Sequence, residues 1–237
     1  MSKDLLQQMR KEASDQSLGL SHAAIYESIL NLIRHLGARG SALDFGAGQG
    51  VLTNRLGATG QFDEVTGVDL MERPPSLDPS FFWRQQDLNE SLGDSVSEWN
   101  EKFDLIVAAE VIEHLENPRA VVRACRSWLK PGGILIMSTP NNESWRALLS
   151  LVFRGHFVDF LDNSYPAHIS ALLACDMQRI YSECALSGVR IEYTNHGGIP
   201  RWPALTWQKL SKHMFKGKRF SDNMIVIGRK QQISMQP

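Results

Sequence analysis

The chain has 237 residues, of which 43% are hydrophobic and 22% charged, and this ordinary globular composition suits one α/β domain over residues 1–237. Its formal net charge of −1 argues against a strongly basic or acidic partner surface at the level of the whole chain. Three cysteines without C-x-x-C spacing make a disulfide framework or a zinc site unexpected. Because the N-terminus lacks an apolar signal core and no apolar run reaches the ~20 residues of a membrane span, we expect a cytoplasmic protein.

The beginning of the chain predicts a helix followed by a strand–loop–helix unit. Residues 1–20 are polar and are expected to form a loosely packed helical arm. Between residues 22 and 36, apolar side chains recur at spacings of three and four, which predicts an amphipathic helix. A short apolar run predicts a strand at 41–45, and a glycine loop and a helix at 49–56 follow it.

The middle of the chain continues this alternation. Strands are predicted at 62–70, 81–86, 103–108 and 134–138. A helix predicted at 117–129 has Pro118 in its first turn and is ended by the sequence Lys-Pro-Gly-Gly. Apolar strands that alternate with helices predict an α/β fold in which helices cover both faces of a parallel sheet.

The last part of the chain predicts one more helix and two strands. Residues 171–187 show helical periodicity, and Gly188 is predicted to end this helix. Strands are predicted at 189–194 and 223–228. Because no helix is evident between these two strands, we expect them to pair antiparallel.

Two long connections interrupt the alternation. Residues 141–169 form an aromatic-rich insertion with three interpretations: a cap over an acceptor pocket, a helix packed into the core, or an element at a membrane interface. Residues 195–221 form a connection rich in Pro, Trp and Lys. This basic stretch is either a solvated face or a surface for an anionic substrate, a membrane or nucleic acid.

The sequence DFGAGQG at 44–50 follows a predicted strand and opens a helix. Its glycines permit a tight turn with positive φ and a close approach of a ligand to the backbone. Asp69 ends the next predicted strand, where a carboxylate can accept hydrogen bonds from both hydroxyls of a ribose. A nicotinamide dinucleotide is the main rival ligand, but the third glycine of its G-x-G-x-x-G pattern would fall on Val51.

Five segments together resemble the motifs of the class I S-adenosylmethionine-dependent methyltransferases, in that family's order. They are LDFGAGQG at 43–50, GVDL at 67–70, QQDLNE at 85–90, FDLIVAAEVIEHLENP at 103–118 and LKPGGILIMSTPN at 129–141. The resemblance implies a Rossmann-like, seven-stranded, mostly parallel sheet with a C-terminal antiparallel hairpin. It also implies S-adenosylmethionine as the cofactor and S-adenosylhomocysteine as the product.

The resemblance also assigns residues to the donor site. They are Asp44, Gly46, Ala47, Gly48, Gly50, Asp69, Leu70, Asp87, Leu88 and Glu110. Among them Asp69 would bind the ribose, Asp87 the adenine amino group, and Leu88 would supply a backbone contact. Within the family, the chain is most similar to ubiquinone-biosynthesis O-methyltransferases and to enzymes that methylate sugars or polysaccharide precursors. This similarity implies O-methylation of a small-molecule or lipid-linked metabolite, with peripheral membrane contact as an open alternative and no nucleic-acid partner.

Glu110, Glu113 and His114 follow the fourth predicted strand at spacings that share one face if the segment is helical. The candidate catalytic residues are His114, Glu113 and His168, with His114 as a general base because imidazole titrates near neutrality. A packing role for His114 stays open. No metal is required in this interpretation; in another, Glu110, Glu113, His114 and His168 hold a divalent metal, as in the RNA 3′-terminal 2′-O-methyltransferases. That RNA enzyme and a catalytically silent donor-binding protein are the alternative functions.

Overall fold

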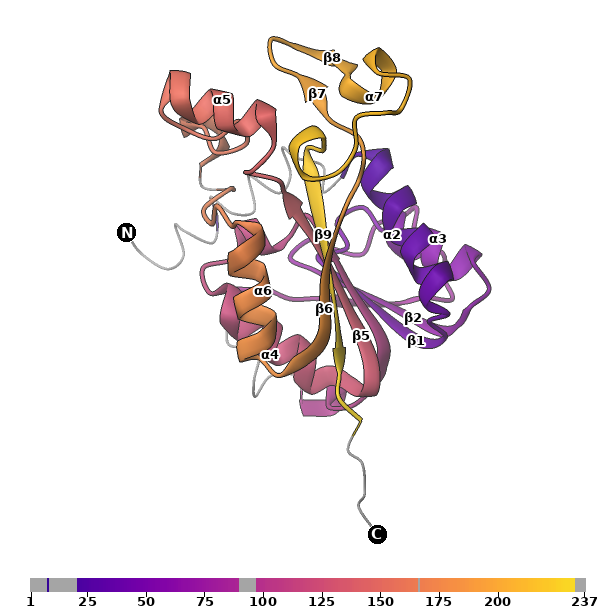
Figure 1. Ribbon diagram of the computed structural model, residues 1–237. Coiled ribbons are helices and arrows are strands. Elements are labelled where there is room, and N and C mark those ends of the chain that lie inside the picture. Colours follow the sequence, from indigo (N-terminus) through magenta and orange to yellow (C-terminus); the bar gives the residue numbers. More distant parts are fainter. Residues whose placement is uncertain (1–7, 9–20, 90–96, 166, 233–237) are drawn as a thin grey trace.

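The computed structural model describes residues 8, 21–89, 97–165 and 167–232 (Figure 1). The helical arm predicted at 1–20 therefore lies outside the described residues except for Gln8. In the ranges that are described, no helix combines the length and the apolar composition needed to cross a bilayer.

A seven-stranded sheet forms the centre of the molecule. Its strands are β1 (Gly40–Phe45), β2 (Phe62–Asp69), β3 (Phe82–Gln85), β4 (Phe103–Ala109), β5 (Leu129–Pro140), β6 (Leu186–Tyr193) and β9 (Asn223–Lys230). Their spatial order is β3-β2-β1-β4-β5-β9-β6; the first five are parallel, and β9 is antiparallel to β5 and β6. The predicted Rossmann-like sheet with a C-terminal antiparallel hairpin is confirmed.

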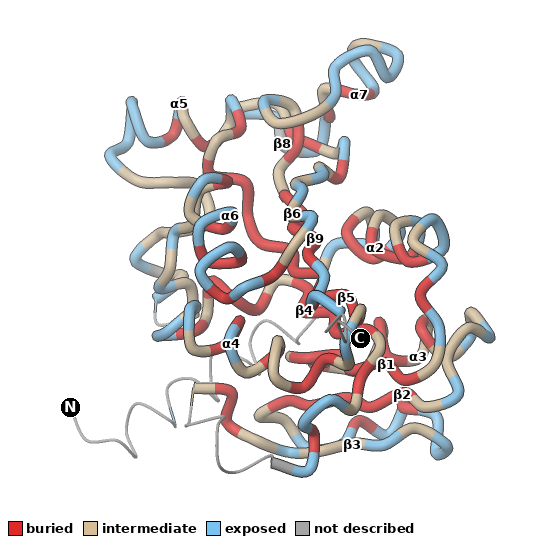
Figure 2. The backbone as a smooth tube through the Cα atoms, turned by 60° about the horizontal axis from the view of Figure 1, so that its bottom comes forward, coloured by how far each residue is buried: buried red, intermediate tan, exposed pale blue. Residues whose placement is uncertain are grey.

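Helices cover both faces of this sheet, and its central strands are buried, whereas the edge strands β3 and β6 are partly exposed (Figures 1 and 2). The helices are α2 (Ala23–Leu36) and α3 (Val51–Ala58) on one face, and α4 (Pro118–Trp128) and α6 (Ala174–Glu183) on the other. Successive residues of β4 enter different cores: Leu105 and Val107 pack with α2 and α3, whereas Ile106 packs with α4 and α6. Such alternation explains why the strand is apolar at every position from Leu105 to Ala109.

Local signals set the helix ends that position the site. Asn117 caps α4 by accepting a hydrogen bond from the backbone N of Ala120, and Pro118 occupies the first helical position. α2 ends at Gly37, whose φ of 65° lies in the left-handed region that glycine tolerates.

The helix predicted at 171–187 is shorter than expected. α6 ends at Glu183 and β6 begins at Leu186. Gly188, with a φ of 60°, lies inside β6 at a register shift in its pairing with β9. The prediction was wrong because glycine with positive φ serves a β-bulge as well as a helix C-terminus, and the local sequence does not distinguish them.

The insertion at 141–169 contains α5 (Trp145–Arg154) and the 3₁₀ turn η3 (Asp162–Ser164). Helix α5 stands beyond the carboxyl end of the parallel strands (Figure 1). Its buried residues are Ala147 and Ser150, whereas Val152 and Phe153 are 74% and 80% exposed. The interpretation of this insertion as a helix packed into the core is therefore wrong.

Residues 195–221, hereafter the C-terminal lobe, connect β6 to β9. The lobe contains the short strands β7 (Gly198–Ile199) and β8 (Trp202–Thr206), the helix α7 (Trp207–Leu210) and the turn η4 (Lys218–Phe220). The buried side chain of Gln208 joins these pieces: it accepts from the backbone N of Gly197 and donates to the carbonyl oxygens of Phe215 and Phe220. One amide thus satisfies three backbone groups that the short elements leave unpaired.

We expect Gln208→Leu to loosen the C-terminal lobe while the sheet stays folded. Leucine retains most of the volume, but it leaves the buried backbone N of Gly197 unpaired, at about 1–3 kcal/mol, and also frees the partly buried carbonyl oxygens of Phe215 and Phe220. Limited proteolysis should then cleave within 195–221 faster than in the wild type, with unchanged hydrogen-exchange protection of β4 and β5. Equal cleavage rates in the two proteins would contradict the structural role of this amide.

Candidate functional site

The glycine loop between β1 and α3 turns sharply and is held by its neighbours. The backbone N atoms of Gly46 and Ala47 both donate to the carbonyl oxygen of Val68, at 2.9 and 3.1 Å. Gly46 has a φ of 78°, and a Cβ there would lie 2.3 Å from Cγ2 of Val111. Glycine at position 46 is therefore required both by the backbone conformation and by the close approach of the Val111 side chain.

The carboxylate of Asp69, at the end of β2, lies against this loop. Its Oδ2 accepts a hydrogen bond from the backbone N of Gly48 at 2.8 Å, and its Oδ1 accepts from the backbone N of Met71 at 3.0 Å. Burial raises the pKa of Asp69, although the hydrogen bonds partly oppose this shift. The structure thus brings together the loop and the acid that the sequence placed at neighbouring strand ends.

Asp44 lies beneath the loop and is almost fully buried. Its Oδ2 accepts a hydrogen bond of 2.7 Å from Oγ1 of Thr53 in the first turn of α3. Burial raises the pKa of Asp44 to about 7, and the nearby charge of Asp69 adds to the shift. This contact ties the end of β1 to the start of α3 and so fixes the loop between them.

The other predicted donor residues follow the ends of β2 and β3. Gln85, the last residue of β3, pairs in register with Asp69 and donates from Nε2 to the carbonyl oxygen of Leu70 at 3.1 Å. Asp87 and Leu88 come directly after and are both buried. The carboxyl ends of three adjacent strands, β1, β2 and β3, therefore carry all predicted donor residues except Glu110.

Glu110 follows β4 and is fixed to two other strands. Its Oε1 accepts from Oγ of Ser138 at 2.8 Å, and its Oε2 accepts from Nδ2 of Asn223 at 2.7 Å. The residue has a φ of 57°, a strained conformation for a non-glycine residue. Burial raises the pKa of Glu110 to about 7. Both carboxylate oxygens are thus occupied by β5 and β9, and Glu110 stands apart from the metal-ligand set that the sequence suggested.

The helical face expected over 110–114 is replaced by a single 3₁₀ turn, η2 (Ile112–His114). The backbone carbonyl oxygen of Glu113 accepts from the N atoms of Ile169 and Ser170, at 2.9 and 3.0 Å. These two bonds fasten the distant segment 167–170 over the turn. The shared face depended on a helix, and only residues 112–114 form a helical turn, so tertiary contacts rather than helical periodicity bring Glu113, His114 and His168 together.

Glu113, His114 and His168 form one cluster at this turn. One potential ligand atom from each lies within 4.8 Å of the others, and Nε2 of His114 is 3.9 Å from Oε1 of Glu113. The two imidazole rings meet edge to face with centroids 4.7 Å apart. Nδ1 of His114 bonds to the carbonyl oxygen of Ala167 at 2.9 Å, and Nδ1 of His168 bonds to that of Asp159 at 2.5 Å. Each Nδ1 is therefore the protonated nitrogen, and each Nε2 can accept a proton or ligate a cation.

The carboxyl group of Glu113 is 0% exposed, and neither of its oxygens has a hydrogen-bond partner among the described residues. Burial raises its pKa well above the usual value and the charge of Glu110 raises it further, while the nearby Thr139 hydroxyl partly opposes the rise. Burial lowers the pKa of His114 to about 4, with a contribution from His168. At neutral pH His114 is thus a neutral imidazole beside a carboxyl group that lacks a counter-charge. This arrangement can take up a proton or bind a cation.

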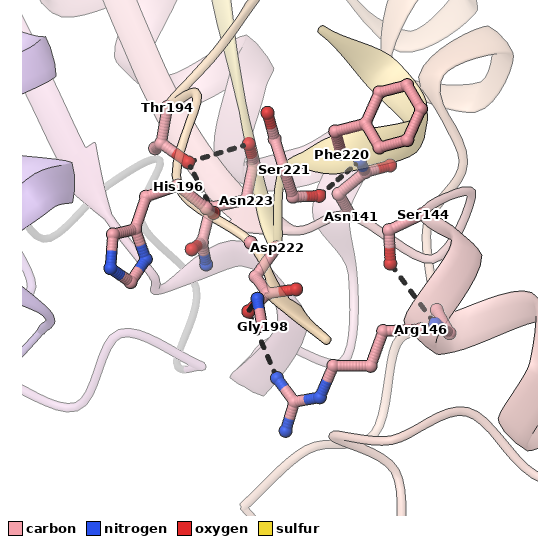
Figure 3. Close-up of polar contacts among 12 residues, drawn as sticks. Asn141, Ser144, Arg146, Thr194, His196, Gly198, Phe220, Ser221, Asp222 and Asn223 are labelled. Atoms are coloured by element: carbon pink, nitrogen blue, oxygen red, sulfur yellow. Dashed lines mark hydrogen bonds and ion pairs between the residues drawn. The ribbon is translucent and has the colours of Figure 1, made fainter. Parts of the chain in front are cut away.

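Further polar contacts join the C-terminal lobe to α5 at the same end of the sheet (Figure 3). Oδ2 of Asp222 accepts from Nη1 of Arg146 at 3.1 Å and from the backbone N of Gly198 at 2.9 Å. Nδ2 of Asn141 donates to the carbonyl oxygen of Ser221 at 2.7 Å. These contacts hold the lobe and the insertion together above the site.

Sequence reasoning missed Asn141, Arg146, Asp222 and Asn223. The available signal was that polar residues directly follow β5 and directly precede β9. Because β9 runs antiparallel, its first residue lies at the edge where the parallel strands end. Recognising that edge from the sequence would have required knowing the pairing of β9 with β5.

Comparisons with known proteins give a consistent result. A family model described as a methyltransferase domain matches residues 20–185. The ubiquinone biosynthesis O-methyltransferase of Idiomarina loihiensis is 31% identical over 156 residues, which cover 63% of this chain and 62% of that protein. The enzyme of the same name from Xanthomonas campestris is 37% identical over 123 residues, which cover 49% of this chain and 48% of the relative. A mitochondrial one from Rattus norvegicus is 36% identical over 118 residues, or 47% of this chain and 34% of the relative. The chain thus spans less than two thirds of each of these relatives.

Solved structures share the fold at low sequence identity. A SAM-dependent methyltransferase from Archaeoglobus fulgidus has a TM-score of 0.58 at 18% identity, covering 86% of this chain and 94% of that one. The N-methyltransferase NodS from Bradyrhizobium japonicum, solved with S-adenosyl-L-homocysteine, has a TM-score of 0.52 at 22% identity, and the match covers 86% of this chain and 85% of that one. At these identities the likeness concerns the fold.

Proposed function

Because the chain belongs to the methyltransferase-domain family and has the fold of the S-adenosylmethionine-dependent enzymes, we propose that it transfers a methyl group from S-adenosylmethionine to a hydroxyl group of a small-molecule acceptor. The contact of the Asp69 carboxylate with the glycine loop carries this proposal. This contact places a carboxylate that can bind the two hydroxyls of a ribose next to the backbone of the glycine loop, at the carboxyl end of a parallel sheet. The relatives named as O-methyltransferases support oxygen as the accepting atom.

The residues present fit the donor. S-adenosylmethionine supplies a sulfonium-bound methyl group, so catalysis requires alignment more than activation. Asp69 would accept hydrogen bonds from both ribose hydroxyls, and Asp87, beyond the end of β3, would accept one from the adenine amino group. Asp44 would position the loop through its bond to Thr53.

On the acceptor side, the chain must hold a hydroxyl group in line with the methyl group and remove its proton. The low pKa of His114 makes this imidazole a weak base by itself. The raised pKa of Glu113 makes its carboxylate the stronger base, and His114 lies beside it. Because Nδ1 is held by Ala167, Nε2 of His114 would take the hydroxyl proton and then release it to Oε1 of Glu113, 3.9 Å away, as the oxygen–methyl bond forms and the sulfur–methyl bond breaks.

The direct test is calorimetry of the purified chain with S-adenosylmethionine, S-adenosylhomocysteine and NADPH, followed by an assay of S-adenosylhomocysteine release with phenolic and sugar acceptors. We expect the two adenosyl ligands to bind and NADPH not to bind. Binding of NADPH alone would overturn the proposal. Binding of both adenosyl ligands without turnover of any acceptor would favour the alternative of a silent donor-binding protein.

A second candidate mechanism rests on the same three side chains. Glu113, His114 and His168 offer a carboxylate and two imidazoles around one point, a ligand set suited to Mn²⁺ and similar cations. The carboxyl group without a hydrogen-bond partner is the specific observation in favour. A bound divalent cation would lower the pKa of an acceptor hydroxyl, and the protein would hold the imidazoles through Ala167 and Asp159. The RNA-end alternative gains no support from the relatives.

Under this second candidate, chelation should lower turnover by about tenfold or more, and added Mn²⁺ should restore it. Electron paramagnetic resonance should show bound Mn²⁺ in the wild type and its loss in His168→Ala. Turnover that survives chelation, together with no bound Mn²⁺, would exclude the cation and leave Glu113 and His114 as the proton acceptors.

A further inference from the structure

We propose that the C-terminal lobe and the exposed end of α5 form one surface that docks on an anionic lipid bilayer and turns the carboxyl end of the sheet toward the membrane. The inference concerns residues 195–221 and 149–154. The lobe lies beyond residues 20–185, which the family model matches, whereas α5 lies within them.

The lobe combines exposed apolar side chains with unopposed basic ones. Its most exposed large apolar residues are Trp202 at 64%, Leu210 at 59% and Met214 at 81%. Basic side chains alternate with them: they are Arg201, Lys209, Lys212, Lys216, Lys218 and Arg219, and the sequence 195–221 contains no Asp or Glu. Lys218 pairs with Glu143. The structure gives no ion pair to Arg201, Lys209, Lys212 or Lys216 within the described residues.

Helix α5 extends the same surface. Val152 and Phe153 are the most exposed apolar residues of α5, and the exposed Arg154 follows them. The two pieces are joined at their base, because the guanidinium of Arg219 stacks 5.6 Å from the ring of Trp145. Both rise from the end of the sheet that carries the glycine loop and the Glu113 cluster (Figure 1).

The chemistry of this surface favours a bilayer over other occupants. Apolar tips between lysines can enter the acyl boundary while the ammonium groups bind lipid phosphates and carboxylates. A two-fold contact with a second copy would instead bring these unopposed lysines against each other. A nucleic acid would match the charge, but it would leave Val152, Leu210 and Met214 without an apolar partner.

Docking would place the acceptor side of the site at the membrane. An acceptor with an acyl or prenyl tail could then present its hydroxyl group to the Glu113 cluster without leaving the bilayer. This last step rests on the proposed function, whereas docking itself does not. Vesicle binding is therefore measured in the absence of S-adenosylmethionine, and donor binding is measured separately by calorimetry on the same proteins.

The test is co-sedimentation with vesicles of phosphatidylcholine alone and with about one quarter phosphatidylserine. We expect the wild type to bind the anionic vesicles, to release on addition of salt, and to bind neutral vesicles far less. A charge variant, Lys209→Gln/Lys212→Gln/Lys216→Gln, should lose about tenfold or more in partition constant, because each basic residue contributes near an anionic surface. An apolar variant, Leu210→Ser/Met214→Ser, should also bind more weakly.

A matched control removes three exposed basic residues away from this surface, as Arg34→Gln/Arg39→Gln/Arg123→Gln. The control should bind vesicles like the wild type, and all variants should keep wild-type affinity for S-adenosylmethionine. Failure of the wild type to bind anionic vesicles, or equal loss in the control and the charge variant, would overturn the docking surface. So would a stable dimer that the charge variant abolishes, or binding to RNA but not to vesicles. Loss of donor binding in the wild type would overturn only the proposed function.

Discussion

Asp69→Ala is expected to reduce the affinity for S-adenosylmethionine by about 10²- to 10⁴-fold. The variant removes a charged acceptor for two ribose hydroxyls, and hydrogen bonds to charged groups are worth about 1.5–3 kcal/mol each. It also leaves the backbone N of Gly48 without its 2.8 Å acceptor, so the loop loses the contact that fixes it. Isothermal titration with S-adenosylmethionine and S-adenosylhomocysteine measures the effect.

Two further variants separate the charge of Asp69 from its geometry. Asp69→Asn keeps one acceptor oxygen in place and should lose less affinity than Asp69→Ala. Asp63→Asn, at the exposed start of the same strand, is the matched control and should bind the donor like the wild type. Donor affinity of Asp69→Ala within about threefold of the wild type, less than one hydrogen bond to a charged group contributes, would disprove the role of this carboxylate.

The strands and the glycine loop were predictable because their determinants are local. The apolar run before Gly46, the three glycines and the acid at the end of the next strand each follow from backbone and burial requirements within a few residues. Parallel pairing then places Asp44, Asp69 and Asp87 at one edge, since the carboxyl ends of parallel strands coincide.

The acceptor side was less predictable because its contacts are long-range. Asn223 reaches Glu110 across 113 positions, and Ala167 reaches His114 across 53. The sequence suggested a helical face at 110–114, but the backbone instead kinks at Glu110 with positive φ. The strain there is retained because Ser138 and Asn223 hold both carboxylate oxygens.

The contacts that organise the C-terminal lobe were also not predictable from the sequence. Its sequence predicted a basic connection, yet the amide of Gln208 and three aromatic rings organise it into an ordered unit. The sequence 195–221 does not predict these contacts, because its helices and strands are too short to show a periodic pattern of apolar residues.

Glu113→Gln is expected to lower the turnover number by about 10²- to 10⁴-fold while the affinity for S-adenosylmethionine stays unchanged. The amide has the volume of the carboxyl group but cannot take up the acceptor's proton. Glu192→Gln, on the exposed face of β6, is the matched control and should turn over like the wild type. Rates of S-adenosylhomocysteine release at saturating donor measure the effect.

The pH dependence distinguishes lost chemistry from a damaged fold. Burial favours the protonated form of Glu113, so the folded protein keeps this proton to higher pH than the unfolded chain, whose glutamate has a pKa near 4.5. The free energy of unfolding of the wild type therefore falls as the pH rises from the pKa of Glu113 in the unfolded chain to its higher pKa in the folded protein. Glu113→Gln cannot ionise at this position, so its stability does not decrease for this reason. The variant should be at least as stable as the wild type at pH 8, yet inactive, whereas wild-type turnover should rise with pH as Glu113 ionises. A variant that keeps wild-type turnover across this range would show that the proton goes to another group.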